Sequence, residues 1–147
     1  DFEIIILADD QILMEKDGKD VKVIPTGPIG PSEKRDIAID YAKGEILAFI
    51  DDDAYPAQDW LKNAVKYFDD GEVAAVGGPG VTPESDTFMQ KASGLLYSSF
   101  FCSGNLTFRY TPGKQCEVDD YPSCNFIVRK TIMEKLGGSA RYNGPTE

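Results

Sequence analysis

The sequence predicts an α/β fold in which helices flank a Rossmann-like, mostly parallel sheet. Three short apolar runs, at residues 3–8, 21–25 and 46–50, have the length and β-branched content of buried strands. Gly/Pro loops and helical patterns separate the later runs, and this β-α-β-α-β alternation favours a parallel sheet with right-handed crossovers. Ligands of such sheets bind beyond the carboxyl ends of the strands.

The second predicted strand, at residues 21–25, leads into a loop rich in glycine and proline. A helix should follow, because Ser32 can cap its start and the helical pattern stops at Gly44. Lys34 and Arg35 then lie in its first turn. Its apolar stripe comprises Ile37, Ala38, Tyr41 and Ala42.

The run at residues 46–50 is the most apolar of the chain and predicts a central parallel strand covered on both faces. Three aspartates follow it directly. A helix is expected to begin at Pro56, and a further strand is expected at residues 73–76. The apolar face of that helix comprises Trp60, Leu61, Ala64, Val65 and Phe68.

The second half of the chain is less regular. Long loops on a rigid sheet commonly carry function, so we expect this half to contribute substrate contacts. The elements expected there are a helix at residues 88–101 interrupted by Gly94, a long loop or irregular hairpin at 102–120, a strand at 124–128, and a short helix at 131–136 closed by Gly137 and Gly138.

The composition limits the classes of function. The 147 residues are 41% apolar, which suits one globular domain with a core. A formal charge of -10 repels a phosphate backbone, so nucleic acid is not expected as a partner. The chain has no histidine, so catalysis must use carboxylates or a metal. Three cysteines without CxxC spacing favour free thiols in a reducing compartment.

Both ends of the sequence look like cuts through a longer protein. A strand-like run begins at residue 3, and residues 144–147 close no element. No apolar run reaches the roughly 20 residues that span a bilayer, and the start lacks the features of a signal peptide. We therefore expect a single partial domain over residues 1–147, without a membrane segment in the visible chain.

The acidic triplet Asp51, Asp52 and Asp53 follows a buried strand. Neighbouring carboxylates repel one another in a partly desolvated site, and a cation would relieve that repulsion. In an extended segment alternate side chains share a direction, so Asp51 and Asp53 are expected to converge on one ion. The alternative is an acidic loop that caps the helix after Pro56.

Two further polar groups are expected at the same edge of the sheet. Asp9 and Asp10 follow the first strand, where carboxylates can accept hydrogen bonds from a nucleobase or ribose. An ordinary Asx turn is the alternative. Lys34 and Arg35 open a helix, whose dipole and free N–H groups attract phosphate. The alternative for this pair is two solvated charges.

These segments resemble the family 2 glycosyltransferases, which have a GT-A fold. The specific motif is Gly-Glu-x-x-x-Phe-x-Asp-x-Asp at residues 44–53. Further segments similar to the family are Ile-Leu-Ala-Asp-Asp at 6–10, Gly-Pro-Ser-Glu-Lys-Arg-Asp at 30–36, and Pro-Ser-Cys-Asn-Phe-Ile-Val-Arg-Lys at 122–130. The chain departs from the family pattern in lacking the strand expected before residue 1, and in Lys34 and Asp36, where small and amide residues are more usual.

The resemblance implies an incomplete GT-A-type domain with two functional halves. Residues 1–80 would bind the nucleotide sugar and the metal, and residues 81–147 would face the acceptor. The implied nucleotide-binding residues are Asp9, Lys34, Arg35, Asp51 and Asp52, the implied metal ligands are Asp51 and Asp53, and Asn125 is implied to lie near the donor sugar or acceptor.

The implied reaction is inverting transfer from a nucleoside diphosphate sugar to a hydroxyl of a saccharide or lipid-linked acceptor, with Mg²⁺ or Mn²⁺ as cofactor. The family's base belongs to an acidic pair after a Gly-rich loop. Glu147 is the candidate for its first acid, with the base just beyond it, so this chain is expected to bind nucleotide better than it transfers sugar.

The implied location is the cytoplasm, or the cytoplasmic face of a membrane in the full-length protein. Two alternative functions stay open. One is a receiver-type phosphoacceptor signalling domain, which also carries acidic residues after its strands. The other is a noncatalytic module that binds a nucleotide without transferring sugar.

Overall fold

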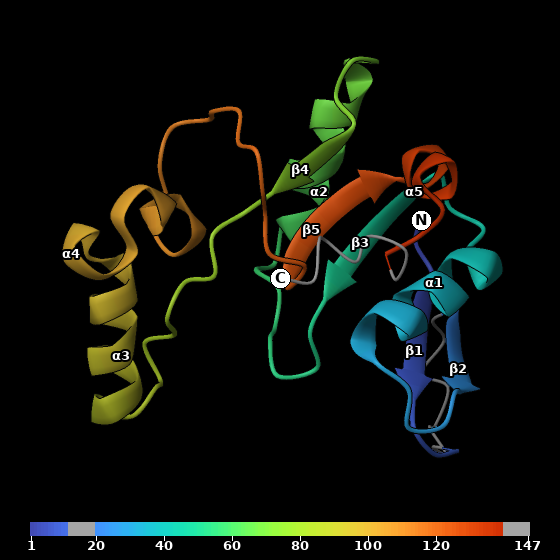
Figure 1. The fold of residues 1–147 in the computed structure, drawn as a ribbon, viewed down its shortest axis with the longest axis horizontal. Helices are drawn as coiled ribbons and strands as arrows, with labels where there is room; N and C mark the ends of the chain where they lie inside the picture. The colour runs from blue at the N-terminus through green and yellow to red at the C-terminus, as the bar shows by residue number, and fades with distance from the viewer. Residues whose placement is uncertain (12–19, 140–147) are drawn as a thin grey trace, which may run out of the picture. The chain divides into compact units, whose positions relative to one another are not determined.

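The computed structural model describes residues 1–11 and 20–139 (Figure 1). The chain divides into two compact units, Asp1–Leu47 with Val128–Glu147, and Ala48–Ile127. In the part of the chain that is described, no helix is both long and apolar enough to cross a membrane. The elements, with η for a 3₁₀ helix, are β1 (Ile4–Ala8), β2 (Val21–Pro25), α1 (Pro31–Tyr41), β3 (Ile46–Ile50), α2 (Trp60–Val65), η1 (Lys66–Asp69), β4 (Ala75–Gly77), α3 (Phe88–Ser98), α4 (Phe100–Ser103), η2 (Gly104–Arg109), β5 (Asn125–Arg129) and α5 (Lys130–Leu136).

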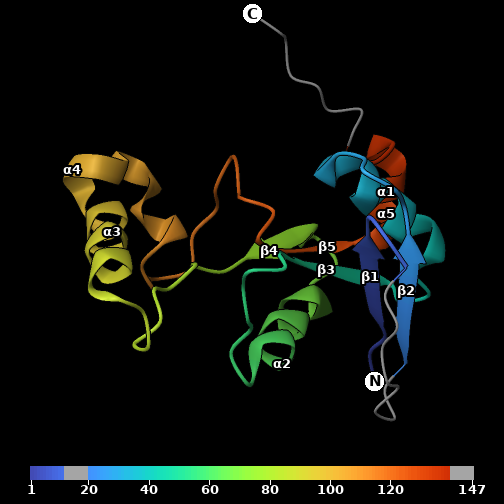
Figure 2. The same cartoon turned by 90° about the horizontal axis from the view of Figure 1, so that it is seen from below.

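The first unit is built on the parallel pair β1 and β2, which lie side by side in Figures 1 and 2. Their register runs from Ile4 opposite Val21 to Ala8 opposite Pro25, so the two strands end at the same level. α1 packs against β1 and α5. The buried apolar side chains of this unit are Ile24, Ile39, Ala42, Leu47, Val128 and Met133.

α1 begins earlier than the sequence predicted, and the expected cap at Ser32 is wrong. Gly30 is the N-cap residue, and its backbone N–H donates to the Glu33 carboxylate at 2.8 Å. Pro31 occupies the first helical position, where its missing N–H costs no hydrogen bond. At the other end of the helix, Lys130 Nζ donates to the carbonyl of Ala42 at 2.7 Å, which satisfies one of the carbonyls left unpaired there.

Gly137 and Gly138 close α5, as the sequence predicted. Gly137 has a φ of 81°, in the left-handed region that glycine adopts without steric cost. A Cβ at Gly138 would lie 2.5 Å from Asp36 Oδ1, so only glycine permits this close approach. The Asp36 carboxylate accepts the backbone N–H of Ser139, which ties the end of α5 to α1.

The second unit is built on a three-stranded sheet of order β3-β5-β4. The rings of Phe49 on β3 and Phe126 on β5 stack with centroids 6.5 Å apart. Ile127 on β5 and Phe68 on η1 are the buried apolar side chains here. Within the described residues, β1 and β2 form a separate sheet, and β3 and β5 point in opposite directions in Figure 1. The predicted single, mostly parallel sheet is therefore not confirmed beyond the β1–β2 pair.

The predicted burial of both faces of β3 is wrong. β3 lies at one end of its sheet, and Ala48 and Ile50 are exposed. The predicted helix start at Pro56 is also wrong, because a turn closed by the Trp60 N–H on the Ala57 carbonyl (3.0 Å) precedes α2. Val65, expected on the apolar face of this helix, is exposed.

α3 runs through Gly94 without the expected interruption and ends at Ser98. A Cβ at Gly94 would lie 1.9 Å from Thr82 Oγ1, so this glycine serves the close approach of a neighbouring segment. The break comes instead at Ser99, whose backbone is extended, and α4 follows directly (Figure 2). The segment expected as a long loop or irregular hairpin at residues 102–120 begins with the end of α4 and the 3₁₀ helix η2, whereas residues 111–120 have no helix or strand.

Candidate functional site

In the first unit, the ends of β1 and β2 are joined by backbone and side-chain hydrogen bonds. The Thr26 N–H donates to the Ala8 carbonyl at 2.8 Å, and its hydroxyl donates to the same carbonyl at 3.1 Å. The Gly27 N–H donates to the Asp9 carbonyl at 3.1 Å, and the φ of 71° at Gly27 permits this turn. Asp9 and Asp10 are therefore presented at a fixed edge, with both side chains exposed.

Lys34 is brought onto Asp9 by the start of α1. Lys34 Nζ donates to Asp9 Oδ1 and forms an ion pair with it. Asp9 is exposed and its carboxylate has a second oxygen, so the pair orients the carboxylate and leaves it an acceptor for a ligand. Lys34 thus has a contact that the sequence did not predict, and its binding to the nucleotide stays a prediction. Arg35 follows it in the first turn of α1.

The acidic triplet lies in the second unit, directly after β3. The expectation that it is extended is wrong, because Asp52 and Asp53 form a turn in which the Ala54 N–H donates to the Asp51 carbonyl at 3.2 Å. The alternation of an extended strand therefore does not set the directions of Asp51 and Asp53. Asp52 and Asp53 are exposed and Asp51 is half-buried, so the turn presents carboxylate oxygens to solvent.

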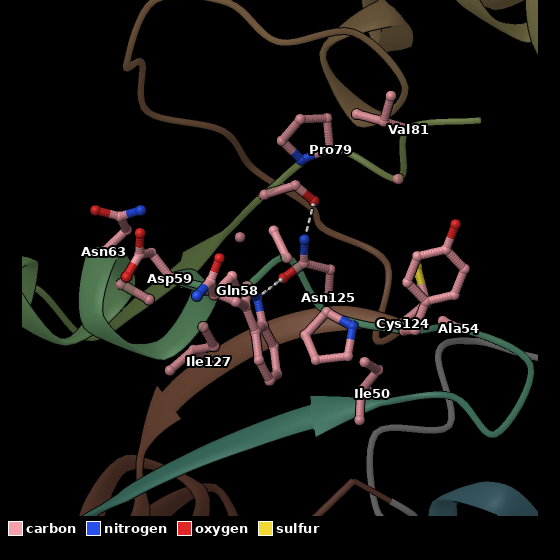
Figure 3. A pocket seen from close by; sticks show the side chains of 18 of the residues that line it. Ile50, Ala54, Gln58, Asp59, Asn63, Pro79, Val81, Cys124, Asn125 and Ile127 are labelled. Carbon is pink, nitrogen blue, oxygen red and sulfur yellow. Dashed lines mark hydrogen bonds between the residues drawn. The ribbon is translucent and has the colours of Figure 1, made fainter. Parts of the chain in front are cut away.

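A cavity of about 960 Å³ lies beside this turn, within the second unit (Figure 3). Asp53 lines it, together with Trp60, Asn125 and the glycine-rich loop at residues 77–80. A volume of this size is in the range of small-molecule and cofactor sites. The lining combines aromatic and apolar side chains with a few polar ones, which is typical of a site that fixes the orientation of a ligand.

Asn125 joins two walls of this cavity through its side-chain amide. Its Oδ1 accepts from Trp60 Nε1 at 2.8 Å, and its Nδ2 donates to the Gly78 carbonyl at 2.7 Å (Figure 3). A Cβ at Gly78 would lie 2.9 Å from Asn125 Nδ2, so the glycine allows this approach. Asn125 therefore holds α2 and the loop after β4 together from the start of β5.

The loop after β4 is also held by Tyr121. A Cβ at Gly77 would lie 2.4 Å from two atoms of the Tyr121 ring, so the ring packs directly on the backbone. Burial raises the pKa of Tyr121 to about 12, Cys124 and Cys116 act in the same direction, and Arg109 opposes them. The phenol is thus neutral at physiological pH, and its role here is packing. Cys102, Cys116 and Cys124 are free thiols, as predicted.

The predicted site residues fall into the two units. Asp9 and Lys34 meet in the first unit, and Asp53 and Asn125 line one cavity in the second. Glu147 lies outside the described residues. Within residues 1–11 and 20–139, no three His, Cys, Asp or Glu side chains gather as a self-sufficient metal site.

Sequence reasoning missed Trp60 and the loop at residues 77–80 as parts of the site. Trp60 was predicted only as part of the apolar face of a helix. The one signal for the loop is Gly77-Gly78-Pro79-Gly80 directly after a strand, which marks a place where another group approaches the backbone closely.

The chain matches the model of a protein family described as Glycosyl transferase family 2 over residues 1–137. The match includes both units and every site segment discussed above except residue 147. Comparisons with curated proteins and with solved structures gave no match.

Proposed function

The chain belongs to glycosyl transferase family 2, and we propose that it transfers a sugar from a nucleoside diphosphate sugar to an acceptor hydroxyl, with a divalent metal and inversion at the anomeric carbon. The observation that carries this proposal is the acidic turn at the end of β3, whose Asp53 lines a ligand-sized cavity together with Asn125. A turn that presents carboxylates to a cavity suits a cation-assisted diphosphate site.

The nucleoside part of the donor is assigned to the first unit. Asp9 accepts hydrogen bonds from the base, and Lys34 keeps its carboxylate oriented through the ion pair. Arg35, one residue further along α1, binds the diphosphate, because a guanidinium can donate two parallel hydrogen bonds to phosphate oxygens. A small residue is more usual in the family at the position of Lys34, and we propose that the lysine is kept there because it positions Asp9.

Asp51 and Asp53 are assigned to Mg²⁺ or Mn²⁺, and Asp52 to the nucleotide. These residues fit such an ion, because Mg²⁺ is usually held by one or two carboxylates plus substrate phosphates and water. A protein cage of three or more ligands is not required for such an ion. When bound, the ion would neutralise charge that develops on the diphosphate leaving group.

The acceptor is assigned to the side of the cavity formed by β5 and the loop at residues 77–80. Asn125 and Trp60 shape this wall through their hydrogen bond. The proposed acceptor is a saccharide or a lipid-linked hydroxyl. In the transfer step the acceptor oxygen attacks the anomeric carbon, the bond to the diphosphate breaks, and a carboxylate takes the hydroxyl proton. Glu147 is our candidate in this chain for the acidic group that takes this proton.

Membership of glycosyl transferase family 2 argues against the receiver-type signalling domain, because the match covers residues 1–137. A noncatalytic nucleotide-binding module differs from a transferase only in turnover. Release of nucleoside diphosphate on addition of donor and acceptor distinguishes the two, and comparison with a chain extended past Glu147 tests where the base lies. Equal turnover in both chains would place the base within residues 1–147.

The proposal is tested by thermal unfolding with a panel of nucleoside diphosphates, each with and without Mn²⁺. A ligand at about 100 times its Kd stabilises the fold by about 2.7 kcal/mol through mass action. We expect one nucleoside diphosphate to raise Tm with Mn²⁺ and to raise it much less without. An unchanged Tm for every nucleotide at millimolar concentration would contradict donor binding.

A further inference from the structure

α3 and α4, which pack against each other, expose six large apolar side chains. We call this set, which comprises Phe88, Met89, Leu95, Leu96, Phe100 and Phe101, the α3–α4 apolar face. The exposed fraction is 82% for Phe88, 73% for Leu95 and 100% for Phe101. Single exposed apolar residues are ordinary, but six large ones on two helices that pack together indicate an interaction surface.

The apolar side of α3 faces away from the protein. Its exposed residues Phe88, Met89, Leu95 and Leu96 fall at positions i, i+1, i+7 and i+8, which form one stripe of a helix. The opposite side carries Gly94, which lies against Thr82. This is the reverse of an ordinary surface helix, whose apolar stripe covers the core.

α3 is a well-capped element, and the side chains are therefore displayed on an ordered scaffold. Thr87 Oγ1 accepts from the Gln90 N–H, and the Gln90 side chain accepts from the Thr87 N–H at 2.9 Å, which completes a capping box. α3 contacts α4, and α4 contacts η2, so the three elements form one body. Tyr97 stacks on Tyr110 at 5.2 Å and joins α3 to the end of η2.

The charge of this segment differs from that of the rest of the chain. Residues 87–116 contain none of the chain's 25 acidic residues, whereas acids stand directly on both sides, at Asp86 and Glu117. The segment carries Lys91, Arg109 and Lys114; Arg109 pairs with Asp120, and the two lysines are exposed. The segment that carries the exposed apolar face thus has basic residues and no carboxylate of its own.

We propose that the α3–α4 apolar face lies on the surface of a lipid bilayer, with its aromatic and aliphatic side chains inserted at the level of the headgroups. Interfacial helices combine Phe and Leu on one face with Lys or Arg beside it, as here. A carboxylate on this face would have to be desolvated at the interface, and none is present in residues 87–116.

A bilayer explains the composition better than a second copy of the chain. In a symmetric dimer the face of one copy would pack on the same face of the other, and residues 87–116 of the second copy offer no acidic partner for an exposed lysine of the first. Lipid phosphates supply negative charge beside an apolar layer. The aliphatic stem of a lysine can lie along the apolar layer while its ammonium group reaches the phosphates.

The test is co-sedimentation of the 147-residue chain with vesicles of phosphatidylcholine, with and without phosphatidylglycerol, and no donor present. We expect the chain to bind both, and the double variant F100S/F101S to lower the partition coefficient about tenfold or more. Phe2→Ser, an exposed phenylalanine outside the face, is the matched control and should bind as the wild type does. Circular dichroism checks that each variant is folded.

A second variant, Lys91→Glu, places a carboxylate beside the face without removing apolar area. It should lower binding several-fold, more strongly on vesicles that contain phosphatidylglycerol. Absence of vesicle binding by the wild type, or equal binding by F100S/F101S, overturns the proposal. A dimer in light scattering that dissociates in F100S/F101S, without vesicle binding, overturns it in favour of self-association. Because no nucleotide takes part, failure here is separate from failure of donor binding.

Discussion

Replacing Asn125 with leucine should loosen the cavity, because one side-chain amide holds two of its walls. Leucine has a similar size but can neither accept from Trp60 Nε1, now at 2.8 Å, nor donate to the Gly78 carbonyl, now at 2.7 Å. Both partners would then lose a hydrogen bond in a half-buried place. Helix α2 and the loop at residues 77–80 would lose this side-chain link.

The magnitude follows from the two bonds. A typical hydrogen bond contributes a net 0.5–1.5 kcal/mol, so two contribute about 1–3 kcal/mol. Water can reach a half-buried site and replace part of this, so we expect Asn125→Leu to lower the free energy of unfolding by about 1–2 kcal/mol. Equilibrium urea unfolding measures this change directly, because the midpoint shifts while the slope stays constant.

A double-mutant cycle with Trp60→Phe isolates the bond between the two side chains. Phenylalanine removes the indole N–H and keeps an aromatic ring, so the coupling energy between the two substitutions should be about 1 kcal/mol. A coupling energy near zero, or an Asn125→Leu variant as stable as the wild type, would refute this account of the wall. The position near the donor sugar or acceptor, which the family resemblance implies for Asn125, would then be its more important role.

Three further predictions concern packing, ionisation and donor binding. Gly77→Ala should cost about 1–3 kcal/mol in urea unfolding, because its Cβ would lie 2.4 Å from the Tyr121 ring, whereas Gly71→Ala, with no atom within 4 Å, should cost less than about 0.5 kcal/mol. Burial raises the pKa of Tyr121 from 10.0 to about 12, so the folded state holds this proton more tightly than the unfolded state; stability should fall as pH rises from 10 to 12, and Tyr121→Phe should lack this contribution. Arg35→Ala should weaken binding of the nucleoside diphosphate by about tenfold or more in calorimetry and that of the nucleoside much less; equal losses would place Arg35 on the base.

Local signals in the sequence predicted most of the elements. The short β-branched runs became β1, β2 and β3, and Gly137 ended α5, because strand content and a left-handed cap depend on neighbouring residues. Helix starts were less predictable. Ser32 and Pro56 are both acceptable first-turn residues, but Glu33 binding to Gly30 and the turn before Trp60 decided the boundaries.

The sequence did not predict which strands and side chains pair over long distances along the chain. The run at residues 46–50 indicated a strand, but its place at the end of a sheet depends on β5, some 75 residues later in the chain. In the candidate site, too, local patterns were predictable and long-range contacts were not. The acidic triplet was recognisable from its pattern, whereas the contact between Trp60 and Asn125 joins residues 65 apart and leaves no periodic signal.

We propose that the acidic turn after β3 binds a metal together with the donor diphosphate. The most direct measurement is calorimetry of nucleoside diphosphate binding with and without Mn²⁺, for the wild type, Asp53→Ala and the control Asp69→Ala. Asp69 is an exposed acid on η1 outside the lining of the cavity. We expect Asp53→Ala to lose the Mn²⁺-dependent affinity, because a ligand of a divalent site contributes several kcal/mol, and Asp69→Ala to retain it. Unchanged Mn²⁺-dependent affinity in Asp53→Ala would contradict the assignment of this turn as the metal site.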